Sequence, residues 1–187
     1  MTQWFVFFLF YSLAGYGLEK LHARLSHSPR QVRKCFLLLP LCPVYGLAMT
    51  ALLALAPADI SLLPLMLLGG VVCTGVEYLV HLFYDKAMGV RFWDYSPMRG
   101  HIRGRICPQF ALVWGVLSAA AVRWVQPFAV LLARVTPAWA AFPLWLALAA
   151  DCVFSAALLR RYQDTEILTL SAVLAQTRAS SQSSTSL

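Results

Sequence analysis

Charged residues are scarce in this sequence. Only 12% of its 187 residues are Asp, Glu, Lys or Arg, whereas 60% are hydrophobic; a typical soluble domain has roughly 25% and 45–50% respectively. Long apolar runs alternate with short stretches that hold nearly all the lysines and arginines. Runs near 20 residues match a bilayer core of roughly 30 Å, and backbone groups in lipid must bond within their own segment. The composition therefore excludes an ordinary soluble domain and predicts an all-α, polytopic bundle of membrane helices.

Two motifs of well-defined chemistry are also missing. The sequence has no G-x-x-x-x-G-K-[ST] loop, so this chain cannot hold and hydrolyse ATP by the P-loop route. Its five cysteines show no C-x-x-C spacing, and we interpret them as small apolar residues. We predict no cofactor from these patterns.

Five apolar runs are long enough to be membrane helices. We expect them at about residues 2–18, 36–56, 62–84, 106–122 and 138–159. They form a single transmembrane domain, residues 1–162, followed by a cytoplasmic tail, residues 163–187, whose Ser-rich end we expect to be disordered. Arg123 and Pro127 interrupt the fourth run, although the apolar stretch 128–132 could extend it.

Positive charges are unevenly distributed between the loops. Thirteen lysines and arginines fall in segments 19–35, 85–105 and 160–187, and only Arg123 and Arg134 fall in the alternate segments. Because Lys and Arg are retained on the cytoplasmic side, we predict an outside N-terminus and an inside C-terminus. The net charge of +7 then reflects cations that face an anionic leaflet, and we predict no nucleic-acid partner.

Two carboxylates fall inside apolar runs, where a charge costs a few kcal/mol. Glu77 shares one helical stripe with Cys73, His81 and Asp85, which recur every four residues. The stripe favours a functional site, but a carboxyl that is protonated or hydrogen-bonded between helices is the alternative for Glu77 and for Asp151. A single histidine without a second histidine pair is weak evidence for metal, so we predict no metal site.

Two other segments carry unusual residues, and the first of them could meet this stripe. In the first helix, Ser12, Gly15 and Glu19 share a face whose small residues permit close helix approach. In the second, Pro43 and Tyr45 belong to a proline-rich start, and such irregular backbone is tolerated where it is buried or lines a cavity.

The loop after the third run is rich in aromatic and charged residues. Trp93 and Tyr95 flank Asp94, and we expect Asp94 to accept hydrogen bonds from Arg103 or Arg105. An interfacial anchor is one interpretation, since aromatic rings suit the headgroup level. We favour an ordered structure that binds something or docks a partner.

These motifs together resemble a known family. They are Tyr11–Tyr16 with Glu19, Pro40–Gly46, Glu77-Tyr78, Trp93–Ser96 and Gly104–Cys107. Over roughly residues 5–114 the chain resembles the ABC-transporter type IV (CmpB-like) permease family of bacterial membrane proteins. It is a divergent member, with Lys34-Cys35, Leu39-Pro40 and His101 where the family pattern has other residues. The resemblance implies a multi-pass protein of the bacterial inner membrane that acts in transport.

The functional hypothesis follows from the resemblance and from the missing phosphate loop. We expect a permease-like subunit, an ATP-binding subunit on a separate chain, and a homo- or hetero-oligomer, because five helices are few for a substrate pathway. The candidate functional cluster is Glu19, Pro43, Tyr45, Glu77, His81, Trp93, Asp94, Tyr95 and Arg105.

Two other functions stay open from the sequence. One is a membrane enzyme acting on a lipid or isoprenoid headgroup, with Glu77 or Asp94 as general base and Arg103 and Arg105 as phosphate clamps. The other is a small accessory membrane protein. No nucleophile–base pair is evident, so we assign no catalytic residue.

Overall fold

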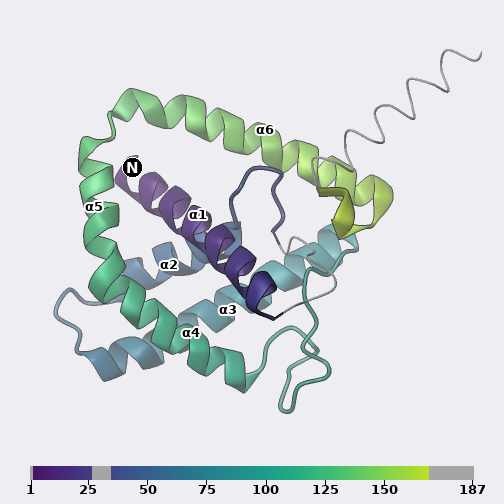
Figure 1. Ribbon diagram of the computed structural model, residues 1–187, viewed down its shortest axis with the longest axis horizontal. Helices are drawn as coiled ribbons and strands as arrows, with labels where there is room; N and C mark the ends of the chain where they lie inside the picture. The colour runs from purple at the N-terminus through teal and green to yellow at the C-terminus, as the bar shows by residue number, and fades with distance from the viewer. Residues whose placement is uncertain (1, 27–34, 169–187) are drawn as a thin grey trace, which may run out of the picture.

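Helices make up most of the described part of the chain, residues 2–26 and 35–168 of a computed structural model (Figure 1). The six α-helices are α1 (Thr2–Leu25), α2 (Pro43–Leu55), α3 (Leu62–Met88), α4 (Pro108–Ala120), α5 (Gln126–Val135) and α6 (Ala138–Tyr162). A π-helical turn, Ala121–Val125, joins α4 to α5, and a 3-10 turn, Thr165–Leu168, follows α6. The only β pairing in these ranges is an isolated bridge between Ile102 and Ile106. The predicted all-α class is confirmed.

Within the described residues, three helical stretches are long and apolar enough to cross a membrane. They are α3, the continuous stretch Pro108–Val135 formed by α4 and α5, and α6, whereas α2 is a shorter apolar helix. Their outward faces carry large apolar side chains, such as Val71, Leu112 and Trp139, each more than 70% exposed. A surface of this kind suits lipid rather than water. The chain has the structure of a helical membrane bundle, and five crossings stay a prediction.

The second expected helix, residues 36–56, begins later than predicted. Helix α2 starts at Pro43, and residues 35–42 are irregular. A proline fits the first helical position because its missing N–H would be unpaired there anyway. Pro40 cannot continue a helix of this kind without the loss of a backbone bond. The apolar side chains of 36 and 37 are buried despite the irregular backbone, which is why hydropathy alone included them.

The fourth helix, predicted over residues 106–122, extends further than expected. The helical path continues to Val135, and the interruption predicted near Pro127 appears as the π-helical turn. Proline lacks an N–H and its ring clashes with the carbonyl four residues earlier, here that of Arg123. A wider turn accommodates the ring without ending the helix. Figure 1 shows the change of direction between α4 and α5.

The remaining helices extend past their predicted cytoplasmic ends. Helix α1 reaches Leu25, α3 reaches Met88 and α6 reaches Tyr162. Polar residues can continue a helix beyond the apolar run, and α3 stops where Gly89 adopts a φ of 71°. Of the expected tail, residues 163–168 pack back on the bundle and bury Ile167 and Leu168. The Ser-rich end lies outside the described residues, as does segment 27–34.

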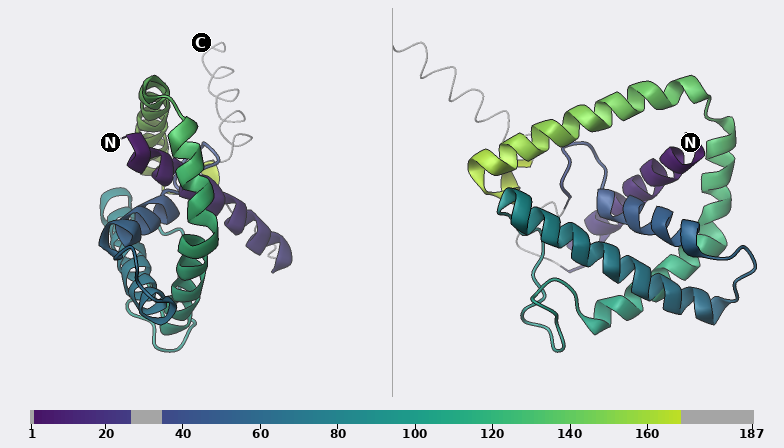
Figure 2. Two further views of the ribbon diagram at one scale, coloured as in Figure 1. Left: turned by 90° about the vertical axis from the view of Figure 1, so that its left-hand side faces the viewer. Right: turned by 180° about the vertical axis from the view of Figure 1, so that it is seen from behind.

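Two separate apolar cores hold the helices together. One joins the C-terminal ends of α3 and α6 through Tyr84, Phe92, Leu159 and neighbours. The other joins α1, α2, the start of α3, α4 and α5. Figure 1 shows the C-terminal ends of α1, α3 and α6 toward one side of the molecule and the α2–α3 connection toward the other, while Figure 2 shows α1 crossing the bundle obliquely.

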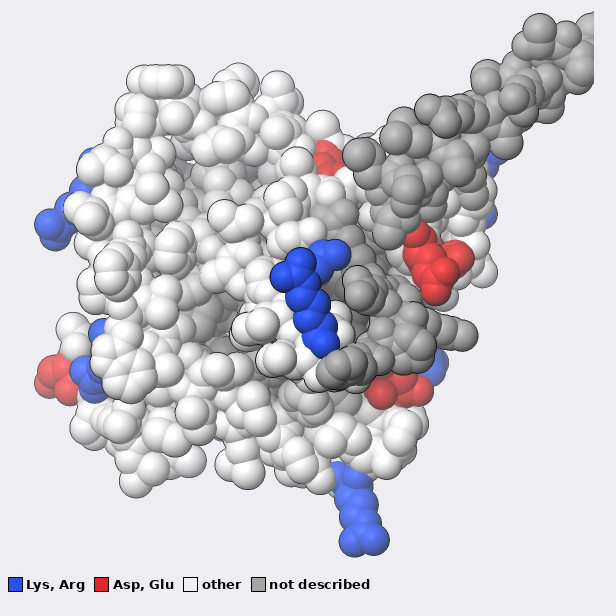
Figure 3. All heavy atoms as spheres, viewed as in Figure 1, with Lys and Arg blue, Asp and Glu red and all other residues white. Residues whose placement is uncertain are grey.

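Charged side chains are few on the face drawn in Figure 3. A broad uncharged area covers most of this face, with acidic and basic groups mainly at its margins and a basic patch near its centre. This distribution matches the separation of charged and apolar stretches in the sequence.

Candidate functional site

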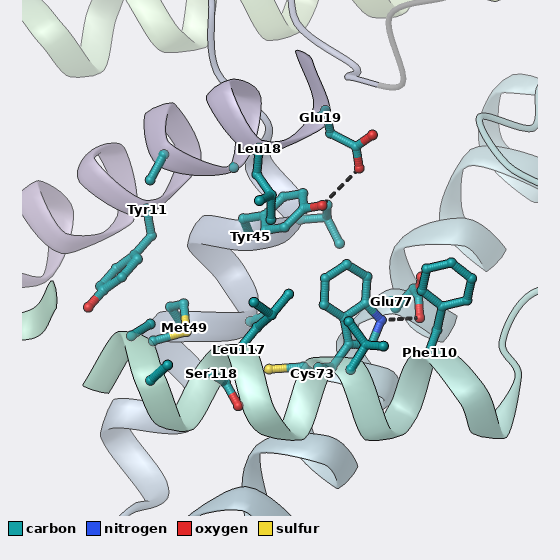
Figure 4. A pocket seen from close by; sticks show the side chains of 18 of the residues that line it. Tyr11, Leu18, Glu19, Tyr45, Met49, Cys73, Glu77, Phe110, Leu117 and Ser118 are labelled. Atoms are coloured by element: carbon teal, nitrogen blue, oxygen red, sulfur yellow. Dashed lines mark hydrogen bonds between the residues drawn. The ribbon is translucent and has the colours of Figure 1, made fainter. Parts of the chain in front are cut away.

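A cavity of about 490 Å³ lies between α1, α2, α3, α4 and the π-helical turn (Figure 4). Most of its surface is apolar, and its lining includes the aromatic residues Tyr11, Tyr45, Trp93, Tyr95, Phe110, Trp114 and Trp124. Two carboxylates, Glu19 and Glu77, also line it, and among the described residues no Lys or Arg does. Figure 4 shows these two acids on different sides of the cavity.

Glu77 is the most buried acid of the site, with 6% of its surface exposed. The Tyr95 hydroxyl donates to its Oε1 at 2.7 Å, and the Trp114 indole N–H donates to its Oε2 at 3.0 Å. Each of the two oxygens thus accepts one hydrogen bond. A carboxylate has about four lone-pair sites, so Glu77 keeps acceptor capacity beyond these two bonds.

Glu19 is held by the second helix. The Tyr45 hydroxyl donates to Oε1 of Glu19 at 2.8 Å, and the Tyr45 ring meets Trp114 edge to face at 5.6 Å between centroids. Gly15 permits this arrangement, because a Cβ there would overlap the Tyr45 ring. The face of Ser12, Gly15 and Glu19 therefore packs on α2, where the Cys42 N–H donates to the Ser12 carbonyl at 2.8 Å. It meets the α3 stripe only across the cavity.

The third loop, residues 89–107, is ordered and folds back over the α3 stripe. The Arg105 guanidinium donates to Oδ2 of Asp85 at 2.7 Å, and the Trp93 indole N–H donates to the Arg105 carbonyl at 3.1 Å. Nε2 of His81 lies 3.0 Å from the Trp93 carbonyl. The hydrogen bond to Asp85 raises the pKa of Arg105. These contacts attach the loop to Asp85 and His81 of the stripe. The next stripe position, Glu77, is attached to the loop through Tyr95.

The predicted partner of Asp94 is wrong. Its Oδ1 accepts from the backbone N–H and the hydroxyl of Ser96, at 2.8 and 2.6 Å, rather than from Arg103 or Arg105. Aspartate readily bonds the backbone two residues on and so forms a local turn. These bonds lower the pKa of Asp94. Gly104, at a φ of 69°, packs against this turn. A Cβ there would lie 2.6 Å from Asp94 Oδ1, so the turn has no room for a side chain at this position.

Tyr95 is the loop residue that contacts Glu77. Its ring stacks on Phe110 at 4.8 Å between centroids while its hydroxyl bonds Glu77. Burial, followed by the charge of Glu77, raises the pKa of Tyr95, so the phenol stays a hydrogen-bond donor at neutral pH.

The structure brings together five of the nine predicted site residues. Glu19, Tyr45, Glu77, Trp93 and Tyr95 all line the cavity. The other four are Pro43, which begins α2, His81 and Arg105, which bind the loop to α3, and Asp94, which is exposed in the loop.

Sequence reasoning missed the contribution of α4. Phe110 and Trp114 lie four residues apart, so they share a helix face, and both line the cavity. A tryptophan with a polar N–H inside an apolar run was the available signal, since a buried indole N–H usually finds an acceptor.

Asp151 lies away from the cavity. Its two carboxylate oxygens accept from the backbone N–H groups of Leu38 and Leu39, at 3.1 and 2.8 Å. The Ser155 hydroxyl donates to it at 3.1 Å. Asp151 thus accepts hydrogen bonds from backbone N–H groups in the irregular segment before α2. This fits the alternative interpretation from the sequence, a carboxyl that is hydrogen-bonded between segments rather than a functional site. In the described ranges no three His, Cys, Asp or Glu side chains gather into a possible metal site.

Comparison with known proteins identifies one family. The family model ABC_trans_CmpB, described as "Putative ABC-transporter type IV", matches residues 6–156. The match covers most of the chain and includes every predicted site residue, and it extends well beyond the residues on which the resemblance rested. No curated protein and no solved structure matches the chain.

Proposed function

The chain belongs to the family described as "Putative ABC-transporter type IV", and from this premise we propose that it is a permease-like subunit that binds a solute in the cavity beside Glu77. The observation that carries the proposal is the buried Glu77 carboxylate at the wall of a 490 Å³ cavity. A carboxylate at membrane depth costs free energy and marks a substrate pathway more often than a packing contact. Its remaining acceptor sites are available to a solute.

The proposal includes the topology and the partner. The chain crosses the bacterial inner membrane five times as one domain over residues 1–162, with its C-terminus in the cytoplasm. ATP hydrolysis belongs to a separate subunit, because this sequence has no phosphate loop. The docking surface for that subunit is one of the two basic loops, residues 19–35 or residues 85–105, and a homo- or hetero-oligomer completes the pathway.

The contacts do not favour a headgroup-modifying enzyme. Arg105, a proposed phosphate clamp, is already bonded to Asp85 and its guanidinium lies over the Tyr78 ring, 5.5 Å from the centroid. Asp94, a proposed base, is engaged by Ser96 and lies outside the cavity lining.

The test is a solute-accumulation screen in a strain that lacks the protein. The strain is complemented with the wild type, with Glu77→Gln, and with Asp59→Asn, an exposed acid of the α2–α3 turn, as a matched control. Accumulation of a panel of labelled solutes is measured with and without ATP depletion, with membrane abundance of each variant measured in parallel.

We expect at least one solute whose ATP-dependent accumulation is restored by the wild type and Asp59→Asn but not by Glu77→Gln at equal abundance. Identical solute profiles in all strains would overturn the transport proposal. A change confined to the lipid composition of the membrane would favour the enzyme.

A further inference from the structure

We propose that the cavity binds an organic cation, that is, an ammonium-type group attached to an apolar body. The inference rests on the proposed function, since it names the chemical class of the solute held beside Glu77. It draws on three features of the lining: its charge, its rings and its apolar area.

The charge of the lining is one-sided. Glu19 and Glu77 contribute the acidic groups, and no described lining residue is Lys or Arg. His22, which is exposed on α1, is the remaining basic side chain of the lining in the described ranges. Arg105 is bonded to Asp85 and does not line the cavity. The cavity therefore favours a positive solute and disfavours an anion.

The acids are also incompletely satisfied. Glu77 accepts one hydrogen bond on each oxygen, and Glu19 accepts one from Tyr45. Each carboxylate has about four acceptor sites. A cation placed between the two acids would offset part of the cost of burying them, as an opposite charge does in a buried pair.

The rings define what kind of cation fits. Tyr45 and Trp114 meet edge to face, and Phe110 stacks with Tyr95 close to Glu77. Aromatic faces attract cations and are the usual means of recognising quaternary ammonium groups. A bare metal ion instead needs several oxygen ligands in a compact shell, and in the described residues no such group forms.

The apolar lining accounts for the rest of the solute. Leu18, Met49 and Leu117 lie along the same cavity as the acids (Figure 4). Ligand cavities of roughly 300–1,000 Å³ typically combine an apolar wall with a few polar groups that fix orientation. The wall would bury a hydrocarbon or aromatic body while the ammonium group meets the carboxylates.

Two probes of nearly the same shape test the inference. Phenyltrimethylammonium carries the positive charge, and tert-butylbenzene is its neutral counterpart. Binding of each to the purified full chain in mild detergent is measured by equilibrium dialysis. The variants are Glu77→Gln, Glu19→Gln and the control Asp59→Asn, and each is checked for folding by size-exclusion chromatography.

We expect the cationic probe to bind the wild type and Asp59→Asn at least tenfold more tightly than the neutral probe. Each Glu→Gln change should reduce that preference several-fold. If Glu77→Gln does not fold, Glu19→Gln and the comparison of the two probes on the wild type still decide the result.

Equal binding of the two probes to the wild type, or a preference unchanged in Glu19→Gln and in folded Glu77→Gln, would overturn the cation inference. The transport proposal would survive that result if the accumulation screen still finds a solute that depends on Glu77. Conversely, a cation preference together with identical solute profiles would refute transport and leave the binding site intact.

Discussion

The close approach of α3 and α4 depends on Gly115, and replacing it tests how the site is assembled. A Cβ at Gly115 would lie 2.6 Å from the Met66 carbonyl oxygen and 3.6 Å from the Gly70 Cα. Both contacts are with backbone, so no flexible side chain can move away. Trp114, the residue before Gly115 on α4, donates a hydrogen bond to Glu77 on α3. Gly115→Ala should therefore separate the helices and weaken this hydrogen bond.

The expected loss of stability can be isolated with a matched control. Overpacking a tight contact costs about 1–3 kcal/mol, but alanine also favours a helix over glycine by roughly 0.5–1 kcal/mol. A Cβ added at Gly75, on α3, would have no neighbouring atom within 4 Å, so Gly75→Ala receives the helix preference without the clash. The difference between the variants should thus be about 1–3 kcal/mol in the free energy of unfolding.

Thermal unfolding in detergent, followed by circular dichroism, measures this difference. For a chain of this size each kcal/mol shifts the Tm by roughly 2–4 °C, so Gly115→Ala should unfold clearly below Gly75→Ala. Its affinity for phenyltrimethylammonium should fall as well, because Trp114 and Glu77 move apart. Equal Tm values for the two variants would refute the close helix contact and the reasoning that places Trp114 on Glu77.

Three further predictions concern other parts of the chain. Because the folded pKa of Asp94 is lowered, its contribution to loop order is complete above the unfolded value of about 3.9 and is lost as the pH falls through the folded value. Protection of the loop amides from hydrogen exchange, expressed relative to the intrinsic rate at each pH, should be high at neutral pH and fall only in acid, whereas in Asp94→Ala it should be low throughout; high protection in that variant would contradict the turn. Asp151→Ala should reduce stability by about 1–2 kcal/mol, since it strands two backbone donors, while Asp59→Ala, measured in the same thermal assay, should not. A reporter fused after Arg161 should be cytoplasmic and one inserted in turn 57–61 external; the reverse pair of signals would invalidate the predicted orientation.

Features that depend on short stretches of sequence were predictable. The class and approximate helix positions follow from the length of apolar runs, because a segment must satisfy its own backbone in lipid. The stripe of Cys73, Glu77 and His81 follows from helical period alone, and all three are buried in the structure. Family membership followed from short motifs as well, and it is confirmed.

The partners of the polar groups required the tertiary structure. Glu77 bonds residues 18 and 37 positions away, and Asp151 bonds Leu38 across 113 positions. The sequence led us to expect Arg103 or Arg105 to pair with Asp94, whereas Arg105 pairs with Asp85. A hydrogen bond needs its two atoms within about 3 Å, and helix period places side chains on a face without saying which face another helix presents. Hydropathy therefore determined that these helices form, whereas their packing decided which acids became structural and which came to line the cavity.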